Sequence, residues 1–305
     1  MKSKSVLLLG GGGFLGSALA GHLCKQDYTV HILTRRAMDS DAPNITVHQG
    51  SLDDNAILEK ILPTCSTVIH LASTTTPGSS ANHPLIEAEQ NIAPTLRFLQ
   101  ILQQYDGLQL IFVSSGGTLY GNPKTIPVSE DHGLYPRSYH GAGKAAIEAF
   151  LMAYSIRPAK HVTILRPSNL YGPGQTMRQG FGVIRTMLEN LRNDTMTEIW
   201  GDGENIRDFL YISDMLAVFD IVLDHKDHTG IYNVGAGKGH SINQIRQVIE
   251  QVCGKAFKFR YLPVRDVDVR QVVLDCSRLK EQLGWQPQVS LEQGIRQTWE
   301  WVKSL

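Results

Sequence analysis

Residues 6–23 constrain the fold more than any other stretch of this sequence. An apolar run at 6–9 leads into four glycines at 10–13, and an amphipathic segment follows them. This order predicts a strand, a tight glycine turn and a helix, which is the setting of a dinucleotide-binding site. Glycines spaced three apart let the backbone reverse and let a pyrophosphate approach the free N–H groups of the helix. The residues expected to contact the dinucleotide here are Gly10, Gly13, Phe14, Leu15 and Gly16.

Further along, apolar segments typical of buried strands alternate with segments typical of helices. The expected strands are residues 28–33, 45–48, 67–72, 109–113 and 161–165. The expected helices are residues 14–23, a helix capped by Asp53 or Asp54 and ended by Pro63, residues 84–105 with a bend at Pro94, and a helix that includes 138–144. This alternation predicts an α/β fold with a Rossmann-type doubly wound parallel sheet. Shorter elements follow, with helices near 181–191, 213–224, 242–252, 277–283 and 291–302.

The charge balance and the cysteine pattern exclude several classes of function. Lys plus Arg and Asp plus Glu both number 29, so nothing suggests attraction to nucleic acid or to an anionic membrane. The four cysteines lack metal-ligand spacing, and we expect free thiols in a reducing cytoplasm and no metal site. No apolar run approaches the roughly 18 residues that a membrane helix needs. Glycines interrupt the apolar run near the N-terminus, which argues against a secretory signal.

The end of the second predicted strand bears on the choice of cofactor. An Asp or Glu at this position would hydrogen-bond the 2′-hydroxyl of the adenosine ribose. The chain instead has Thr34 followed by Arg35 and Arg36. Because two cations suit a 2′-phosphate, the residues favour NADP slightly. The alternative is that both arginines are solvated surface charges and that the cofactor is NAD.

Several further motifs follow the glycine turn in a fixed order. They are residues 68–72, 114–121, 138–144, 166–175, 200–203, 207–208, 232–235 and 283–285. Together they make nearly the whole chain resemble the extended short-chain dehydrogenases/reductases of the NAD-dependent epimerase/dehydratase family, closest to the UDP-glucose 4-epimerase type. The resemblance implies an NAD(P)-binding domain at 1–166, to which a segment near 205–235 returns. It also implies a smaller nucleotide-sugar domain at 167–305.

What the resemblance implies for function is epimerisation at C4 of a UDP-hexose or UDP-N-acetylhexosamine through a 4-keto intermediate, in a homodimer. The cofactor site would also include Ser51, Leu52, Leu71, Ala72, Ser73 and Lys144. Asn169 would meet the sugar diphosphate, Arg207 and Arg265 would pair with its phosphates, and Asp268 would contact the ribose. The alternative is that Arg207–Asp208 and Arg265–Asp268 are surface ion pairs.

The catalytic motif departs from the family pattern at the acid/base position. In this family a Tyr lies four residues before a Lys, whose charge lowers the pKa of the phenol. Here His140 lies four residues before Lys144, and Tyr139 lies five before it. Residues four apart share a helix face, whereas residues five apart point about 140° from each other. A regular helix therefore puts His140 in the catalytic position, although a looped start would let Tyr139 reach it.

A second departure concerns the hydroxyl that would bond the 4-oxygen of the sugar. Four residues before Tyr120, where the family has Ser or Thr, the chain has Gly116, with Ser115 one residue early and Thr118 two late. His140 or Tyr139 is then the acid/base, or the site has lost its chemistry and only binds ligands. There are two alternatives to the epimerase. An NADPH-dependent 4-keto-sugar-nucleotide reductase fits Arg35 and Arg36 better, and the displaced Tyr and Ser suggest a non-catalytic protein that binds cofactor and nucleotide sugar.

Overall fold

The computed structural model describes residues 4–177, 182–265 and 268–305. The chain forms two compact units, each built from separate stretches of sequence. Unit 1 takes its residues from Met1–Ser114, Tyr139–Leu165 and Phe219–Ile231, and unit 2 from Ser115–Ser138, Arg166–Val218 and Tyr232–Leu305.

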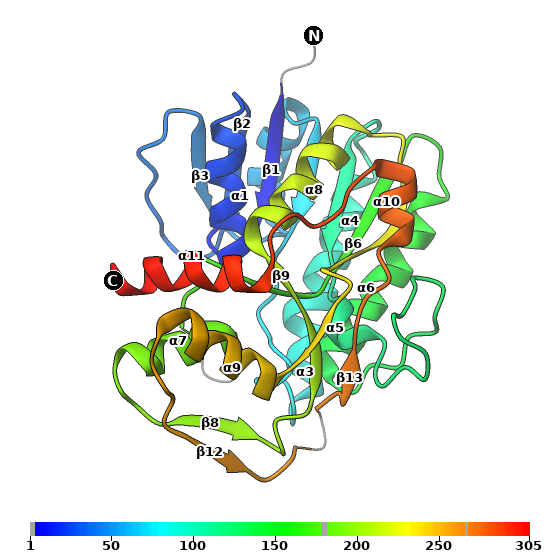
Figure 1. Cartoon of the computed structure of the whole chain (residues 1–305). Coiled ribbons are helices and arrows are strands. Elements are labelled where there is room, and N and C mark those ends of the chain that lie inside the picture. Colours follow the sequence, from blue (N-terminus) through cyan, green and yellow to red (C-terminus); the bar gives the residue numbers. More distant parts are fainter. Residues whose placement is uncertain (1–3, 178–181, 266–267) are drawn as a thin grey trace. The chain divides into compact units, whose positions relative to one another are not determined.

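Unit 1 is organised around a seven-stranded sheet with the order β10-β6-β5-β4-β1-β2-β3 (Figure 1). Its strands are β1 (Ser5–Leu9), β2 (Thr29–Thr34), β3 (Ile45–Gln49), β4 (Thr67–His70), β5 (Gln109–Val113), β6 (His161–Pro167) and β10 (Gly230–Val234). Every pairing from β3 to β6 is parallel. The chain adds strands on one side of β1 and then on the other, so the predicted Rossmann-type doubly wound sheet is confirmed.

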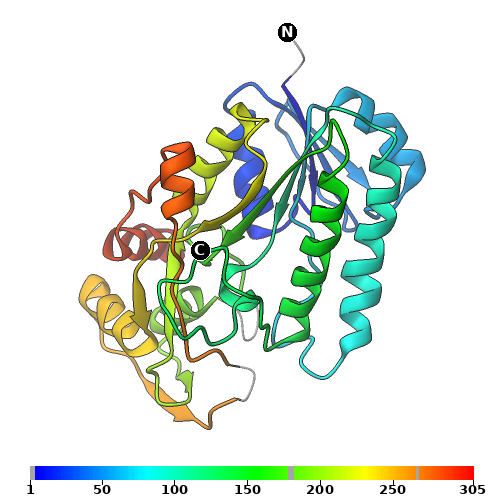
Figure 2. The same ribbon diagram turned by 90° about the vertical axis from the view of Figure 1, so that its right-hand side faces the viewer.

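Apolar residues on the strands and helices of unit 1 form its core. The helices are α1 (Phe14–Cys24), α2 (Asn55–Ile61), the 3₁₀ turn η1 (Leu62–Thr64), α3 (Pro84–Glu87), the π-turn η2 (Ala88–Ile92), α4 (Ala93–Leu102) and α6 (Tyr139–Ser155). Figure 2 shows α4 and α6, drawn in cyan and green, side by side, and the two helices are in contact. Leu110 of β5, Phe98 of α4 and Ile147 of α6 are buried together in one cluster.

Two helix predictions in unit 1 have different outcomes. Asp54, one of the two residues expected to cap this helix, caps α2 by accepting a hydrogen bond from the Ile57 N–H at 3.2 Å. The helix expected over 84–105 with a bend at Pro94 covers 84–102, and a π-helical turn at Ala88–Ile92, just before that proline, divides it into α3 and α4. Pro94 has no N–H for the carbonyl of Gln90 and its ring would clash with that carbonyl, so the wider turn relieves the conflict.

Unit 2 contains smaller sheets and most of the C-terminal helices. Its strands are β7 (Asn169–Tyr171), β8 (Thr197–Trp200), β9 (Ile206–Tyr211), β11 (Gly239–Ser241), β12 (Phe259–Leu262) and β13 (Gln271–Val272). One sheet has the order β11-β9-β13 with β7 beside β9, and β12 pairs with β8. The helices are α5 (Gly116–Leu119), α7 (Val183–Arg192), α9 (Ile242–Cys253), α10 (Ser277–Leu283) and α11 (Leu291–Lys303), while α8 (Ile212–Asp224) starts in unit 2 and ends in unit 1. Phe181, expected at the start of a helix, lies outside the described residues.

The segment after β5 belongs to unit 2, although sequence analysis placed the domain boundary at residue 166. Side chains of unit 2 hold it there. The Tyr120 hydroxyl donates to Asn233 Oδ1 at 2.7 Å and accepts from Arg166 at 2.8 Å. Val128 forms a β-bridge with Leu274. The first domain is therefore interrupted between β5 and α6.

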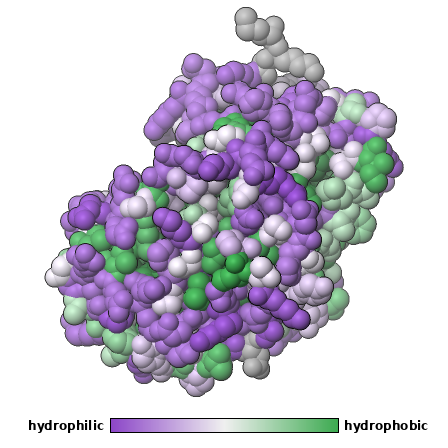
Figure 3. Space-filling view, turned by 45° about the vertical axis from the view of Figure 1, so that its right-hand side comes forward, coloured by the Kyte–Doolittle hydropathy of each residue, from purple (hydrophilic) through white to green (hydrophobic). Residues whose placement is uncertain are grey.

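The surface is mainly hydrophilic on the face shown in Figure 3, with separate apolar patches. A search of the described residues finds no helix with the length and hydropathy to span a bilayer. The same residues hold no group of three His, Cys, Asp or Glu side chains suited to a metal ion. The four cysteines are free thiols.

Candidate active site

The glycine turn has the geometry of a cradle. Gly10 has φ +87°, and a Cβ there would lie 2.7 Å from the Cα of Ala72. A Cβ on Gly16 would lie 2.6 Å from the Cα of Gly11, so only glycine lets α1 close onto the turn. At Gly12 and Gly13, by contrast, the nearest atoms to an added Cβ are 3.5 Å or more away. This space beside the backbone is what a pyrophosphate needs.

The start of α1 leaves its backbone donors available to an anion. Gly13 is the N-cap residue, and no side chain caps the helix. The helix has 11 residues, so its positive dipole end adds to the attraction of the N–H groups. Phe14 and Leu15, the first two residues of α1, are partly buried. The residues present therefore fit a dinucleotide phosphate.

Residues from three strand ends lie around this turn. The Gly10 N–H donates to Leu33 O at 3.1 Å and the Leu71 N–H donates to Leu9 O at 2.9 Å, so β1, β2 and β4 end together. Ala72 and Ser73 follow Leu71 directly, and the Ser73 side chain is exposed. The structure thus brings the three residues expected after β4 to the glycine turn.

The end of β2 lies beside Gly12. A Cβ on Gly12 would be 3.7 Å from Thr34 Oγ1, which accepts a hydrogen bond from the Arg36 N–H at 3.3 Å. Arg35 and Arg36 are exposed, and neither guanidinium group has a hydrogen-bond or ion-pair partner among the described residues. Both cations are therefore available to a ligand at the turn.

Ser51 and Leu52 follow β3, next to the end of β2. The Gly50 N–H donates to Thr34 O at 2.9 Å, which brings this loop to the same edge of the sheet. Ser51 is exposed and its hydroxyl donates to Asp53, while Leu52 packs against the core. The two residues expected from the family resemblance thus lie in the loop beside Thr34, at the end of β2.

Helix α6 is regular from its first residue, and this decides how its side chains point. Tyr139 begins the helix and is 42% exposed, whereas His140 is 8% exposed. His140 and Lys144 are both buried and lie one helical turn apart. Because the helix is regular here, His140 lies on the same face as Lys144, in the position where the family has tyrosine.

Lys144 is held at the carboxyl end of β5. Its Nζ donates to the Val113 carbonyl at 2.8 Å and lies 4.6 Å from the centroid of the Phe112 ring. Burial lowers the pKa of Lys144 to about 8, although the carboxylates of Glu87 and Glu148 oppose the shift. Burial and the Lys144 charge together lower the pKa of His140 to about 3. His140 is therefore neutral at physiological pH.

A buried polar cluster faces His140, and sequence analysis did not identify it. The Thr75 hydroxyl hydrogen-bonds Glu87 Oε2 and lies 3.1 Å from both Asn91 Nδ2 and His140 Nδ1. Asn91 Nδ2 also donates to Glu87 Oε1 at 3.0 Å. All four residues are buried. A Cβ on Gly143 would overlap the Glu87 carboxyl group, so α3 and α6 can approach closely only because that residue is glycine.

The two candidate hydroxyls for the sugar oxygen lie in unit 2 and differ in their bonding. Ser115 precedes α5 and does not cap it, and its hydroxyl has no partner among the described residues. The Thr118 hydroxyl donates to the Ser115 carbonyl at 3.4 Å. Ser115 is therefore the freer of the two. Ser114 also has a buried hydroxyl without a partner in the described structure.

The predicted diphosphate residues also lie in unit 2. Arg207 is half-buried on β9, and desolvation lowers its pKa to about 10, with Asp268 raising it and Arg265 lowering it further. Arg265 donates to both oxygens of Asp268, at 2.8 and 3.0 Å. The three residues are therefore close enough to interact. Asn169 lies beside Gly117, and its Nδ2 donates to Asp208 O at 2.8 Å.

Of the two ion pairs considered as an alternative, Arg207–Asp208 does not form and Arg265–Asp268 does. Asp208 is buried and accepts hydrogen bonds from the N–H groups of Ala236, Gly237 and Leu274, so it does not pair with Arg207. Arg265 and Asp268 do form an ion pair. Arg207 is thus a half-buried cation without a carboxylate in hydrogen-bond contact among the described residues.

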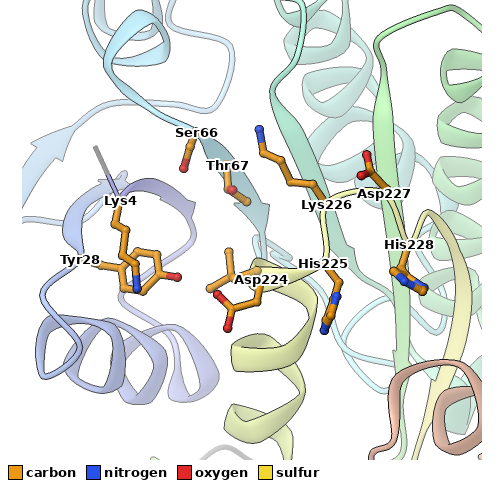
Figure 4. A pocket seen from close by; sticks show the side chains of 10 residues that line it. Lys4, Tyr28, Ser66, Thr67, Asp224, His225, Lys226, Asp227 and His228 are labelled. Atoms are coloured by element: carbon orange, nitrogen blue, oxygen red, sulfur yellow. The ribbon is translucent and has the colours of Figure 1, made fainter. Parts of the chain in front are cut away.

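A cavity of about 490 Å³ lies elsewhere in unit 1 (Figure 4). Its lining residues are Lys4, Tyr28, Ser66, Thr67, Leu223, Asp224, His225, Lys226, Asp227 and His228. Lys4 and Ser66 come just before β1 and β4, so this cavity is at the amino ends of the strands. Ligands of doubly wound folds bind at the carboxyl ends. The cavity is therefore separate from the cofactor site.

Residues 6–235 match the NAD dependent epimerase/dehydratase family. The chain belongs to this family. A putative UDP-glucose 4-epimerase of Methanocaldococcus jannaschii is 31% identical over 303 residues and aligns over 98% of each chain. A dTDP-4-dehydro-6-deoxyglucose reductase of Escherichia coli is 29% identical over 96% of each chain. The crystal structure of UDP-glucose 4-epimerase from Thermotoga maritima with UDP-glucose has a TM-score of 0.91 and 30% identity, covering 98% of this chain and 99% of that one.

In this member of the NAD-dependent family, the glycine turn follows β1, residues 71–73 follow β4, residues 114–121 follow β5 and residues 138–144 span the start of α6. The residues that sequence analysis missed, Thr75, Glu87 and Asn91, carried a weaker signal. Thr75 is in a polar loop after a buried strand, where α/β proteins bind ligands. Glu87 and Asn91 are four residues apart, which is the spacing of neighbours on a helix.

Proposed function

We propose that this protein is a nucleotide-sugar epimerase that inverts C4 of a UDP-hexose or UDP-N-acetylhexosamine through a 4-keto intermediate. The observation that carries the proposal is the buried pair of His140 and Lys144 on α6, in a chain of the NAD-dependent epimerase/dehydratase family. The putative M. jannaschii epimerase and the T. maritima epimerase, whose structure contains UDP-glucose, support this class of substrate.

Eight of the predicted residues have a role in the proposed reaction. His140 Nε2 removes the proton of the 4-hydroxyl and later returns it, and Lys144 holds the nicotinamide ribose. Ser115 donates to the 4-oxygen, with Thr118 as the second choice. Asn169, Arg207 and Arg265 bind the diphosphate, and Asp268 binds the ribose. When bound, the nicotinamide would accept a hydride from C4 of the sugar and return it.

The proposed cofactor is NADP or NAD, with NADP favoured by the two free guanidinium groups of Arg35 and Arg36. The proposed assembly is a homodimer. Apolar side chains exposed along α6 support it, since Phe150 and Met152 are 48% and 42% exposed and Ile156, just after the helix, is 84% exposed.

Turnover by the purified protein tests the proposed reaction. With UDP-glucose and no added reductant, we expect conversion to UDP-galactose, followed by chromatography, and loss of conversion in Lys144→Ala. His140→Ala should lower the rate of the chemical step at least tenfold, because general acid/base catalysis contributes about 10²–10⁴-fold. Tyr139→Phe is the matched control and should retain activity. Loss in Tyr139→Phe with retention in His140→Ala would reverse the assignment.

A reductase is the second candidate, favoured by Arg35 and Arg36 and by the similarity to the E. coli reductase. Stoichiometric consumption of NADPH with a 4-keto-sugar nucleotide, without conversion of UDP-glucose, would establish it in place of the epimerase. A protein that binds both ligands but turns over neither would instead be the non-catalytic alternative. Turnover that disappears in Lys144→Ala excludes that alternative.

A further inference from the structure

We propose that Glu87, acting through the Thr75 hydroxyl, sets the tautomer of His140 and finally accepts the proton that His140 removes from the substrate. This inference rests on the proposed function, since it assigns a relay to the same site. Glu87 and Thr75 are positioning residues, because neither contacts the substrate. The hydrogen-bond directions in the buried cluster carry the argument, and they can be deduced one residue at a time.

Asn91 is the first fixed point of the cluster. Its Oδ1 accepts hydrogen bonds from the N–H and the hydroxyl of Thr74, at 2.9 and 3.2 Å. The amide group is therefore oriented, and both hydrogens on Nδ2 point into the cluster. One is donated to Glu87 Oε1 and the other to Thr75 Oγ1.

The Thr75 hydroxyl is the second fixed point. It has one hydrogen and two lone pairs, and it contacts three groups. One lone pair accepts from Asn91 and the hydrogen goes to the Glu87 carboxylate, which can only accept. The remaining lone pair faces His140 Nδ1 at 3.1 Å. His140 must therefore carry its hydrogen on Nδ1 when Glu87 is ionised.

This tautomer leaves His140 Nε2 as a free lone pair. Nε2 has no hydrogen-bond partner among the described residues and is not one of the buried unpaired atoms. A proton from a substrate hydroxyl can therefore reach it. The structure holds the imidazole in the form that a general base requires.

The proton transfer balances along the chain of hydrogen bonds. The substrate O–H bond breaks as the His140 Nε2–H bond forms, and the Nδ1–H proton passes to Thr75 Oγ1. The original Thr75 proton passes to Glu87 Oε2. His140 ends neutral, Thr75 ends as a hydroxyl, and Glu87 ends as a carboxylic acid. In each of these hydrogen bonds the donor and the acceptor have then exchanged roles. The reverse transfers return the proton to the sugar oxygen.

The relay explains how His140 can act as a base although its low pKa prevents it from keeping the proton. An imidazole with a pKa of about 3 does not hold a proton at neutral pH. Burial raises the pKa of Glu87, although its hydrogen bonds with Thr75 and Asn91 and the Lys144 charge oppose the shift. Other titratable groups that interact with Lys144 are Glu148 on α6 and His70 on β4. Glu87 is the carboxylate in hydrogen-bond contact with Thr75.

The substitution Glu87→Gln tests the relay sharply because Asn91 fixes the orientation of the new amide. Asn91 Nδ2 requires an acceptor, so the amide oxygen faces Asn91 and the amide nitrogen faces Thr75. Thr75 must then accept from that nitrogen and donate to His140 Nδ1. We expect ¹⁵N NMR to show His140 as the Nδ1–H tautomer in the native protein and as the Nε2–H tautomer in the variant. The His140 signals are identified by their loss in His140→Ala.

The same variant should lose the chemical step. We expect the single-turnover rate with UDP-glucose to fall about 10²-fold or more, as for loss of a general base, while KM changes less. In the native protein this rate should also fall as the pH drops and protonates Glu87, whose pKa burial raises, and the variant should lack that fall. Glu89→Gln is the matched control, because Glu89 is exposed in the same π-turn. It should behave like the native protein in both measurements.

Two substitutions at Thr75 separate the relay from packing. Thr75→Ser keeps the hydroxyl and should keep both the tautomer and most of the rate. Thr75→Val keeps the shape but removes the hydroxyl, and should slow the step as Glu87→Gln does. Circular dichroism melting shows whether each variant is folded. Equal rates for the Ser and Val variants would overturn the relay.

The failures are distinguishable. An unchanged His140 tautomer in Glu87→Gln, or a rate within threefold of native while His140→Ala is inactive, overturns the relay and leaves the proposed function standing. Native protein that converts no UDP-hexose overturns the proposed function. In that case the NMR measurement alone decides whether Glu87 sets the tautomer of His140.

Discussion

Arg35 and Arg36 carry the proposal that the chain prefers NADP to NAD. Both side chains are exposed just after Thr34, which lies beside Gly12, and their guanidinium groups have no partner in the described part of the chain. Hydrogen bonds to charged groups contribute about 1.5–3 kcal/mol, so two such groups suffice for a clear preference. The proposed preference for NADP therefore depends on these two side chains.

Replacing both arginines should change that choice. We expect the double variant Arg35→Ala, Arg36→Ala to bind NADP at least about tenfold more weakly, which corresponds to about 1.4 kcal/mol, with less than a threefold change for NAD. Isothermal titration with both cofactors measures this. Lys60→Ala, which removes an exposed cation from α2, is the control. Equal losses for the two cofactors would show that the arginines do not contact a 2′-phosphate.

Helix geometry narrowed the acid/base position to His140 in a regular helix or Tyr139 in a looped start, and the sequence could not choose between them. Four residues before Lys144 is the same face of α6, and the burial of His140 and exposure of Tyr139 agree. Thr75 and Glu87 could not be predicted in the same way. Thr75 is 65 residues from His140, and their contact depends on how β4, α3 and α6 pack. A contact between distant segments leaves no periodic pattern in the sequence.

At the scale of elements, α1 and its glycine turn offer a test of close packing. Gly16→Ala would place a Cβ 2.6 Å from the Gly11 backbone, and overpacking of this kind costs about 1–3 kcal/mol of the free energy of unfolding. We expect that loss in urea unfolding, together with weaker cofactor binding. Gly21→Ala in the same helix meets nothing within 4 Å and should add about 0.5–1 kcal/mol. Equal stability of the two variants would contradict the close approach.

The strands were easier to predict than the helix after β4. Buried parallel strands are short apolar runs, and β5 has the bounds expected from sequence. The π-turn at Ala88–Ile92 was not expected, because Pro94 indicates only that the helix must adjust somewhere. Where it adjusts depends on the polar contacts of Glu87 and Asn91 at either end of the turn. These contacts appear only in the folded chain.

At the scale of the whole molecule, buried histidines make stability depend on pH. Burial is the main cause that lowers the pKa of both His70 and His140 to about 3, so the folded state binds fewer protons than the unfolded state below about pH 6.5. Their contribution to stability is complete above that pH and is lost as the pH falls toward 3. Each should cost about 2 kcal/mol between pH 7 and pH 5.

Urea unfolding at pH 7 and pH 5 measures this loss. We expect the change in free energy of unfolding between the two pH values to be about 2 kcal/mol smaller in His140→Gln than in the native protein. His83→Gln, which alters an exposed histidine, should leave the change as it is. The comparison uses differences between pH values, so a constant effect of the substitution cancels. The same pH dependence in all three proteins would contradict a neutral buried His140.

The discontinuity of unit 1 has a consequence for its synthesis on the ribosome. Residues 219–231 complete this unit, and the buried Gln109 side chain donates to the Val222 carbonyl at 2.8 Å. Domains form as units while the chain emerges from its N-terminal end. The dinucleotide-binding unit therefore cannot be finished when Leu165 emerges. Its sheet stays incomplete, with β6 unpaired on one side, until residues up to Ile231 have also emerged from the ribosome.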